Sequence, residues 1–183
     1  MTDSDPITAL GTTDPKKVSR EEFVTLLEAA SEAATDGGGV DLSSLGAEQF
    51  ARLISRASTA QIEAVMARPE LRENVLDEVF RRMGEHYKSD KARSTEAVVR
   101  WRIGTDEHDH LRYECVLSGG TCTVGKQPEH EPRATITLGP VEFLKLASGN
   151  ASAPTLFMTG KLKVAGDVGF AAGLTKLFQI PKA

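Results

Sequence analysis

The sequence predicts an α+β fold: a five-stranded, mostly antiparallel sheet covered by helices, with an all-helical N-terminal extension. Two changes of hydrophobic period carry this prediction. Up to about residue 85 the apolar residues recur every three or four positions, as on one face of a helix. From residue 97 to 138 they alternate with polar residues, as in strands with one packed face and one wet face. The last quarter of the chain returns to a strand and then to a helix.

The N-terminal part divides into a tail and a helical extension. Residues 1–18 show no hydrophobic period, and we expect a mobile tail there. Residues 19–67 form the expected extension, in which the capping boxes Ser19–Glu22 and Ser58–Gln61 each open a helix. Three glycines at 37–39 predict a flexible joint between these helices.

Residues 68–183 form the expected main domain. Pro69 suits the first position of its opening helix, where an amide would have no partner. The apolar stripe of that helix consists of Leu71, Val75, Leu76, Val79, Phe80 and Met83. Four strands are expected at 97–103, 111–117, 121–124 and 134–138, and Pro140 begins a short helix that stops at Gly149.

The closing segment combines a strand and a helix. Leu162 and Val164 alternate with Lys161 and Lys163, which is the period of a half-buried strand. After Gly166 the period lengthens, and Asp167 is placed to cap the first turn of a helix. The residues at helical spacing there are Phe170, Leu174, Leu177 and Phe178.

This closing segment resembles the C-terminal signature of the sterol carrier protein type 2 family. The shared features are Phe157 in an aromatic segment, the run Gly160-Lys-Leu-Lys-Val-Ala-Gly-Asp167, and a helix with spaced leucines. The order of elements from about residue 70 to 180 also matches that family. The resemblance implies a sterol carrier protein type 2-like domain that encloses an apolar tunnel between a sheet and helices. It further implies binding of fatty acyl chains, sterols or related lipids.

The candidate lipid-binding residues come from the sheet and from the last helices. The resemblance places them around the tunnel, whereas each one taken alone is better explained by a close-packed core. They are Trp101, Phe143, Leu146, Phe157, Met158, Leu162, Val164, Phe170, Leu174, Leu177 and Phe178.

Other functional classes find little support. A net charge of −4 without a long basic cluster argues against a nucleic-acid partner, and no segment has the length of apolar sequence that integral membrane association needs. Cys115 and Cys122 flank a turn at 118–120 as a diagonal pair, which suits two small thiols better than a disulfide. His108 and His110 have no third ligand at a recognised spacing, so no metal and no cofactor is expected. No arrangement of serines, cysteines, histidines or carboxylates predicts a catalytic site.

These observations lead to two hypotheses. The first is a non-enzymatic, cytoplasmic protein that binds and carries a hydrophobic ligand (a fatty acid, a sterol or an acyl-CoA) in a tunnel gated by the C-terminal helix. The cytoplasmic location rests on a polar, acidic N-terminus and on a C-terminal Pro181-Lys-Ala that is no peroxisomal address. The second is an accessory module with a filled core, whose N-terminal helices dock a protein partner, for example an enzyme.

Overall fold

The computed structural model describes residues 6–35, 45–85, 87, 94–104, 111–127, 129–147 and 151–173. These residues fall into two compact units, the first reaching Glu78 and the second beginning at Val79. The sequence placed this boundary at residue 68. It lies instead within the helix α5 (Pro69–Glu85), because Phe80 near the end of that helix belongs to the core of the second unit.

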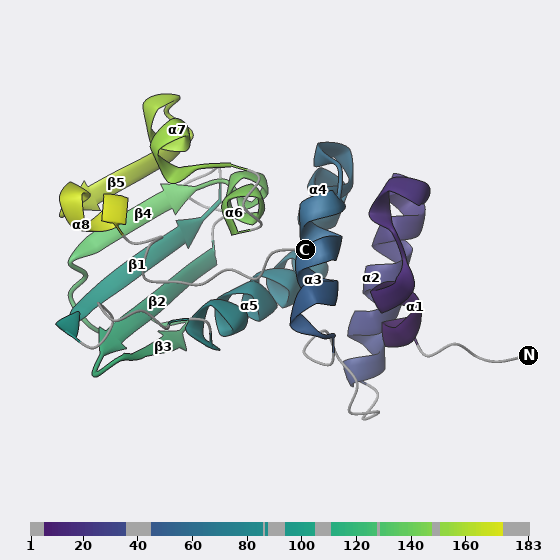
Figure 1. The fold of residues 1–183 in the computed structure, drawn as a ribbon, viewed down its shortest axis with the longest axis horizontal. Coiled ribbons are helices and arrows are strands. Elements are labelled where there is room, and N and C mark those ends of the chain that lie inside the picture. Colours follow the sequence, from purple (N-terminus) through teal and green to yellow (C-terminus); the bar gives the residue numbers. More distant parts are fainter. Residues whose placement is uncertain are drawn as a thin grey trace, which may run out of the picture. The chain divides into compact units, whose positions relative to one another are not determined.

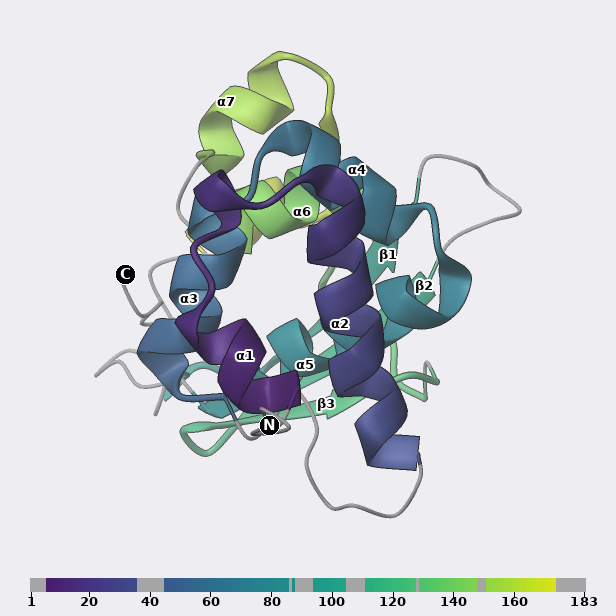
Figure 2. The same cartoon turned by 90° about the vertical axis from the view of Figure 1, so that its right-hand side faces the viewer.

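The first unit is helical, as expected. Its helices are α1 (Pro6–Thr12), the 3₁₀ turn η1 (Pro15–Lys17), α2 (Arg20–Thr35), α3 (Ala47–Arg56) and α4 (Thr59–Met66). Within this unit α2 packs against α1 and α4, and α1 packs against α3 (Figure 2). Both predicted capping boxes are present, since Glu22 and Gln61 accept hydrogen bonds from the backbone amides of Ser19 and Ser58.

The prediction of a mobile tail is wrong for residues 6–18, which include α1 and η1. Leu10 on α1 is fully buried, so this segment has an apolar anchor that a periodicity search over so few residues does not detect. The buried side-chain amide of Gln61 also donates hydrogen bonds to the backbone oxygens of Pro15 (2.8 Å) and Val18 (3.1 Å). The predicted glycine joint at 37–39 lies outside the described residues.

The second unit contains the five-stranded sheet. Its strands are β1 (Ala97–Ile103), β2 (Leu111–Ser118), β3 (Thr121–Gly125), β4 (Ala134–Leu138) and β5 (Leu162–Gly166). They lie side by side in the order β3-β2-β1-β4-β5 (Figure 1). All pairs are antiparallel except β1 with β4, so the predicted mostly antiparallel sheet is confirmed.

The turn between β2 and β3 has the predicted position. Gly119 and Gly120 both have positive φ (60° and 83°), as the two central residues of a type I′ hairpin require. The resulting register pairs Leu117 with Cys122 and Cys115 with Val124, which leaves the two cysteines diagonal to each other. Both cysteines are free; Cys115 is buried and Cys122 is half-buried.

An aromatic cluster forms the core beneath the inner face of the sheet. Phe80 of α5 stacks on Tyr113 of β2 at 4.0 Å and on Phe143 at 4.8 Å between ring centroids. Phe143 belongs to α6 (Pro140–Ala147). Trp101 of β1 meets both phenylalanines edge-on, at 5.8 and 5.6 Å. These four rings fix the side of the sheet on which the helices lie.

Two short helices complete the unit. The first is α7 (Ala153–Met158), where the sequence predicted a loop or a single turn; Ser152 caps it by accepting from the amide of Thr155. The second is α8 (Val168–Gly173), the start of the predicted C-terminal helix. Residues 174–178, which the sequence placed in the same helix, lie outside the described part of the chain.

Candidate functional site

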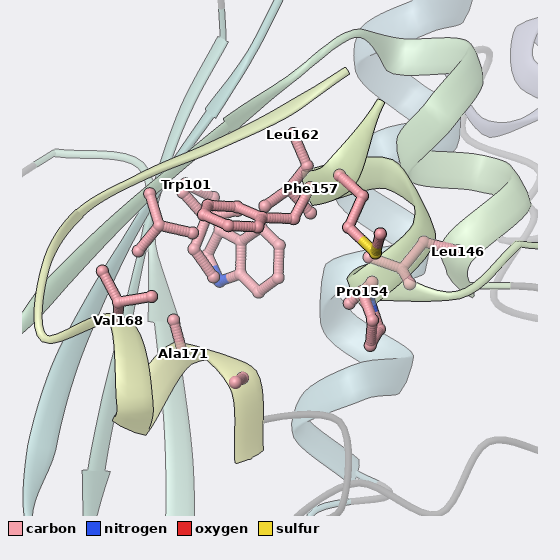
Figure 3. A pocket seen from close by; sticks show the side chains of 12 residues that line it. Trp101, Leu146, Pro154, Phe157, Leu162, Val168 and Ala171 are labelled. Carbon is pink, nitrogen blue, oxygen red and sulfur yellow. The ribbon is translucent and has the colours of Figure 1, made fainter. Parts of the chain in front are cut away.

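A cavity with a volume of about 220 Å³ lies on the inner face of the sheet, between α6, α7 and α8 (Figure 3). Every described residue around it is apolar. They are Trp101, Ile136, Leu146, Ala153, Pro154, Phe157, Met158, Leu162, Val164, Val168, Ala171 and Ala172. The described part of the wall has no charged or hydroxyl side chain, and such a wall suits a hydrocarbon.

One row of side chains across the sheet forms the floor of the cavity. Trp101 on β1 pairs with Ile136 on β4, which in turn pairs with Val164 on the edge strand β5. Directly paired residues point to the same face of a sheet, so these three side chains lie next to one another. The two-residue period of the sequence is therefore what places Trp101 and Val164 in one wall.

The back of the cavity is closed by the aromatic core. Trp101 is only 4% exposed, and its indole makes T-shaped contacts with both Phe80 and Phe143. Phe143 itself is 1% exposed and stacks on Phe80, so it supports the wall from behind and does not line the cavity. Leu146, one turn further along the same side of α6, does line it.

The mouth of the cavity is formed by α7 and α8. Leu156 is buried and anchors α7, and its backbone oxygen accepts a hydrogen bond of 2.9 Å from the amide of Lys161, the residue before β5. On the next residues the side chains of Phe157 and Met158 reach the cavity and also remain in contact with solvent. Val168, the first residue of α8, is likewise exposed at the opposite side of the mouth (Figure 3).

Polar contacts hold the start of α8 against the sheet. Asp167 accepts a hydrogen bond from the amide of Phe170 (2.9 Å) and another from Nε of Arg133 (3.1 Å). These two contacts, the capping amide first, lower the pKa of the Asp167 carboxyl. The guanidinium of Arg133 also lies 4.3 Å from the centroid of the Phe170 ring. The ring of Phe170 thus packs against the guanidinium of Arg133, and Phe170 does not line the cavity.

A second polar cluster lies on the outer face of the sheet. Glu114 is 4% exposed, although the alternation of β2 predicted a solvated position. Its carboxylate accepts hydrogen bonds from Nδ1 of His130 (2.8 Å) and from the amides of Glu129 (3.1 Å) and His130 (3.2 Å). Burial opposes ionisation, but these three donors outweigh it and lower the pKa of Glu114. Nothing in this cluster faces the cavity, and we assign it a structural role.

The structure brings together six of the eleven predicted site residues. Trp101, Leu146, Phe157, Met158, Leu162 and Val164 line the cavity, whereas Phe143 and Phe170 do not. Leu174, Leu177 and Phe178 lie outside the described residues. The sequence analysis missed Ile136, although the alternation of β4 places its side chain on the packed face; its pairing with Trp101 is seen only in the structure. It also missed the small residues of α7 and α8, which have no aromatic or aliphatic signal.

Metal sites and membrane-spanning helices are both absent from the residues that the structure describes. No group of three or more His, Cys, Asp or Glu side chains there is arranged to hold a metal ion. No helix within the same residues is long and apolar enough to cross a membrane.

Known proteins resemble this chain both in sequence and in structure. Hydroxysteroid dehydrogenase-like protein 2 of Bos taurus is 25% identical over 111 residues, which cover 61% of this chain and 26% of that protein. The Homo sapiens protein of the same name is 24% identical over 117 residues, covering 64% and 28%. The chain thus spans about a quarter of the length of these curated relatives.

Among solved structures, sterol carrier protein 2 from Yarrowia lipolytica in its apo form matches 57% of this chain and 87% of its own, with 26% identity and a TM-score of 0.47. A double mutant of the sec-alkyl sulfatase PisA1 matches 95% of this chain and 32% of its own, with 14% identity and a TM-score of 0.52. The latter shows a shared fold that includes the N-terminal helices. Residues 76–179, over half of the chain, match the model of the SCP-2 sterol transfer family. The chain therefore belongs to the SCP-2 sterol transfer family.

Proposed function

We propose that this chain binds an apolar lipid, such as a fatty acid or a sterol, and carries it in the cavity between the sheet and α6, α7 and α8 without chemical change. The observation that carries the proposal is that all described residues lining the cavity are apolar, in a chain of the SCP-2 sterol transfer family. The polar head group of such a ligand would stay at the mouth, where Phe157, Met158 and Val168 meet solvent.

The size of the cavity sets the expected affinity. An apolar cavity of roughly 150 Å³ binds a benzene molecule, so one of about 220 Å³ holds about nine carbon atoms by proportion. At about 0.8 kcal/mol for each methylene, nine carbons contribute roughly 7 kcal/mol before ordering costs. That value corresponds to a dissociation constant of about 10 μM, the tightest binding that this cavity alone supports.

The single tryptophan of the chain is a built-in reporter for this proposal, because Trp101 lies in the cavity floor. Saturated fatty acids of increasing length, and a sterol, are titrated against Trp101 fluorescence. Each added methylene should tighten binding about fourfold until about nine carbons are accommodated. The absence of any fluorescence change with every fatty acid and with the sterol would refute lipid binding in this cavity.

A matched pair of variants on β5 tests the location. Val164 points into the cavity, and the next residue, Ala165, points to the outer face. The variant Val164→Phe should fill the cavity and weaken fatty-acid binding at least tenfold, whereas Ala165→Phe should bind as the unaltered chain does. Equal binding by both variants would place the ligand elsewhere.

Gating by the C-terminal helix is part of the same proposal. The described part of α8 supplies Val168, Ala171 and Ala172 to the wall, and Leu174, Leu177 and Phe178 follow them in the sequence. A chain that ends at Gly173 should therefore release bound fatty acid faster in stopped-flow measurements than the full chain. An unchanged release rate would argue against a gate.

A second candidate function is an accessory module of an enzyme. This candidate is favoured because similar regions occur as parts of longer proteins. The matched region forms about a quarter of the dehydrogenase-like relatives, and the fold recurs as about a third of PisA1. In this case the N-terminal helices would dock a protein partner, and the ligand would be dispensable. Native mass spectrometry of the gently purified chain separates the two, because a carrier should retain lipid and a module with an empty or filled core should not.

A further inference from the structure

Met158 is both a wall residue of the cavity and a side chain in open contact with water. It is 85% exposed, and it lines the mouth together with Phe157 and Val168 (Figure 3). Among the described residues that line the cavity, only Met158 carries sulfur. A thioether is a soft, polarizable group that oxidants convert to a sulfoxide. The sulfur of this wall is therefore accessible to an oxidant dissolved in water.

The other methionines that the structure describes are less accessible. Met66 on α4 is 6% exposed, and Met83 on α5 is half-buried. Because susceptibility to oxidation follows the access of the oxidant to sulfur, an oxidant in water reacts with Met158 first.

The turn after α7 holds Met158 at the mouth without using its sulfur. The amide of Thr159 donates to the backbone oxygen of Thr155 at 3.0 Å. The amide of Gly160 donates to the backbone oxygen of Phe157 at 3.1 Å, and Gly160 ends the turn with a φ of +77°. Backbone contacts thus fix the position of Met158, so a chemical change at its sulfur alters the mouth and leaves the fold intact.

From this arrangement we infer that Met158 is an oxidation site at which hydrogen peroxide lowers the affinity of the cavity for its apolar ligand. The inference rests on the proposed lipid-carrying function and adds how uptake is regulated. In the reaction the sulfur lone pair forms an S–O bond with one peroxide oxygen while the O–O bond breaks. The sulfur is oxidised to the sulfoxide, the peroxide is reduced, and its other oxygen leaves as water with both protons.

The sulfoxide acts mainly on the ligand-bound state. In the free chain its oxygen is hydrated, because the side chain of Met158 is exposed. A bound acyl chain covers the same side chain, and the described wall around it offers no hydrogen-bond donor in place of the lost water except the buried indole of Trp101, which lies in the floor and away from the mouth. Such uncompensated loss of water should weaken fatty-acid binding by about fivefold to tenfold for a partly covered side chain.

Peptide mapping of the full chain after exposure to hydrogen peroxide tests the site. The tryptic peptide 146–161 contains Met158 and no other methionine. It should gain oxygen roughly tenfold faster than the peptide that contains Met66. Saturating fatty acid should slow the oxidation of Met158, because the ligand covers the sulfur. Equal rates at Met66 and Met158, or no protection by fatty acid, would overturn the inference.

Titration of Trp101 fluorescence with a saturated fatty acid measures the consequence. The oxidised chain should bind about fivefold more weakly, and methionine sulfoxide reductase should restore the original affinity. Met158→Gln imitates the sulfoxide with a polar amide and should weaken binding to a similar degree without peroxide. Met158→Leu keeps an apolar side chain of similar volume, so its binding should stay within about twofold of the unaltered chain before and after peroxide.

Cys122 is a competing target of the oxidant. The thiol of Cys115 hydrogen-bonds to Cys122 and lowers the pKa of Cys122, which favours the reactive thiolate. Met158→Leu retains both cysteines, so peroxide that still weakens fatty-acid binding by this variant would place the effect at a thiol and overturn the inference. Met66→Leu is the matched control and should respond to peroxide as the unaltered chain does.

The untreated chain separates this inference from the carrier function. Failure of the untreated chain to bind any fatty acid would refute carriage itself. Normal binding that is unchanged after complete oxidation of Met158 would refute only its regulation by peroxide. Urea unfolding of the oxidised chain should match that of the untreated chain, and a lowered free energy of unfolding would trace the weaker binding to the fold and overturn the inference as well.

Discussion

The side chain of Arg133 donates a hydrogen bond of 3.1 Å from Nε to Oδ2 of Asp167, which joins the residue before β4 to the residue before α8. The same two residues are also joined through the backbone, where the amide of Asp167 donates a hydrogen bond of 3.0 Å to the carbonyl oxygen of Arg133. Asp167 then caps α8, and Arg133 covers the ring of Phe170. This one cluster positions the helix that forms one side of the cavity mouth.

We predict that Arg133→Ala loosens α8 without unfolding the chain. The variant loses the contact with Phe170, and cation–π contacts at exposed sites contribute roughly 0.5–1 kcal/mol, a twofold to fivefold change in an opening equilibrium. Hydrogen exchange of residues 168–173 should accelerate by about that factor. Arg56→Ala, which breaks a comparable exposed pair with Asp14 in the first unit, is the control and should leave that exchange unchanged.

Among the described glycines of the second unit, Gly166 is predicted to be the least replaceable. Its φ is +90°, and a Cβ there would lie 2.5 Å from the backbone oxygen of Arg133. Gly160 has a similar φ of +77° but open space around the Cβ position. Gly160→Ala should therefore show only backbone strain, about 1 kcal/mol, whereas Gly166→Ala adds a clash and should cost about 2–4 kcal/mol in urea unfolding. Equal losses would show that the contact with Arg133 is relieved by a small movement.

The buried Glu114 should make stability depend on pH. Hydrogen bonds from His130 and Glu129 lower the pKa of this carboxyl in the folded chain, so folding favours its ionised form. The resulting stabilisation is complete above the ordinary glutamate pKa and is lost as the pH falls below it through the folded-state value. Glu114→Gln should lower the free energy of unfolding by about 1–3 kcal/mol at pH 7, because an amide NH₂ then meets backbone donors. The same variant should show a weaker pH dependence of the unfolding free energy below about pH 4.5. Glu131→Gln, on an exposed residue of the same loop, is the control and should keep the acid dependence of the unaltered chain.

The strands and the face on which each side chain lies could be predicted from the sequence, because period-two alternation is a local property. Trp101, Leu162 and Val164 lie on the packed face of their strands and line the cavity. The burial of Glu114 could not be predicted, since it depends on a loop 15 residues further along the chain that folds back over β2. A pattern within one strand carries no information about such a cover.

The short helices were harder to predict. Six residues make less than two turns, so α7 has too few positions to show a helical period, although Ser152 and Pro154 were suitable start signals. On α6 the sequence showed which residues are apolar but not which of them faces the cavity. Phe143 was therefore taken for a ligand contact, whereas it packs on Phe80 and Leu146 lines the wall.

The different positions of Phe143 and Phe157 predict opposite consequences of substitution. Phe143 is 1% exposed within the aromatic core, so Phe143→Ala should cost about 3–5 kcal/mol of folding free energy. Phe157 is 48% exposed, and Phe157→Ala should cost less than about 1 kcal/mol. Fatty-acid affinity should respond in the reverse order: Phe157→Ala removes about 1 kcal/mol of ligand contact, a roughly fivefold loss, while the milder Phe143→Leu should bind within twofold of the unaltered chain. Urea unfolding measures the folding free energy, and titration of Trp101 fluorescence measures the fatty-acid affinity. Weaker fatty-acid binding by Phe143→Leu than by Phe157→Ala would mean that the ligand reaches the aromatic core.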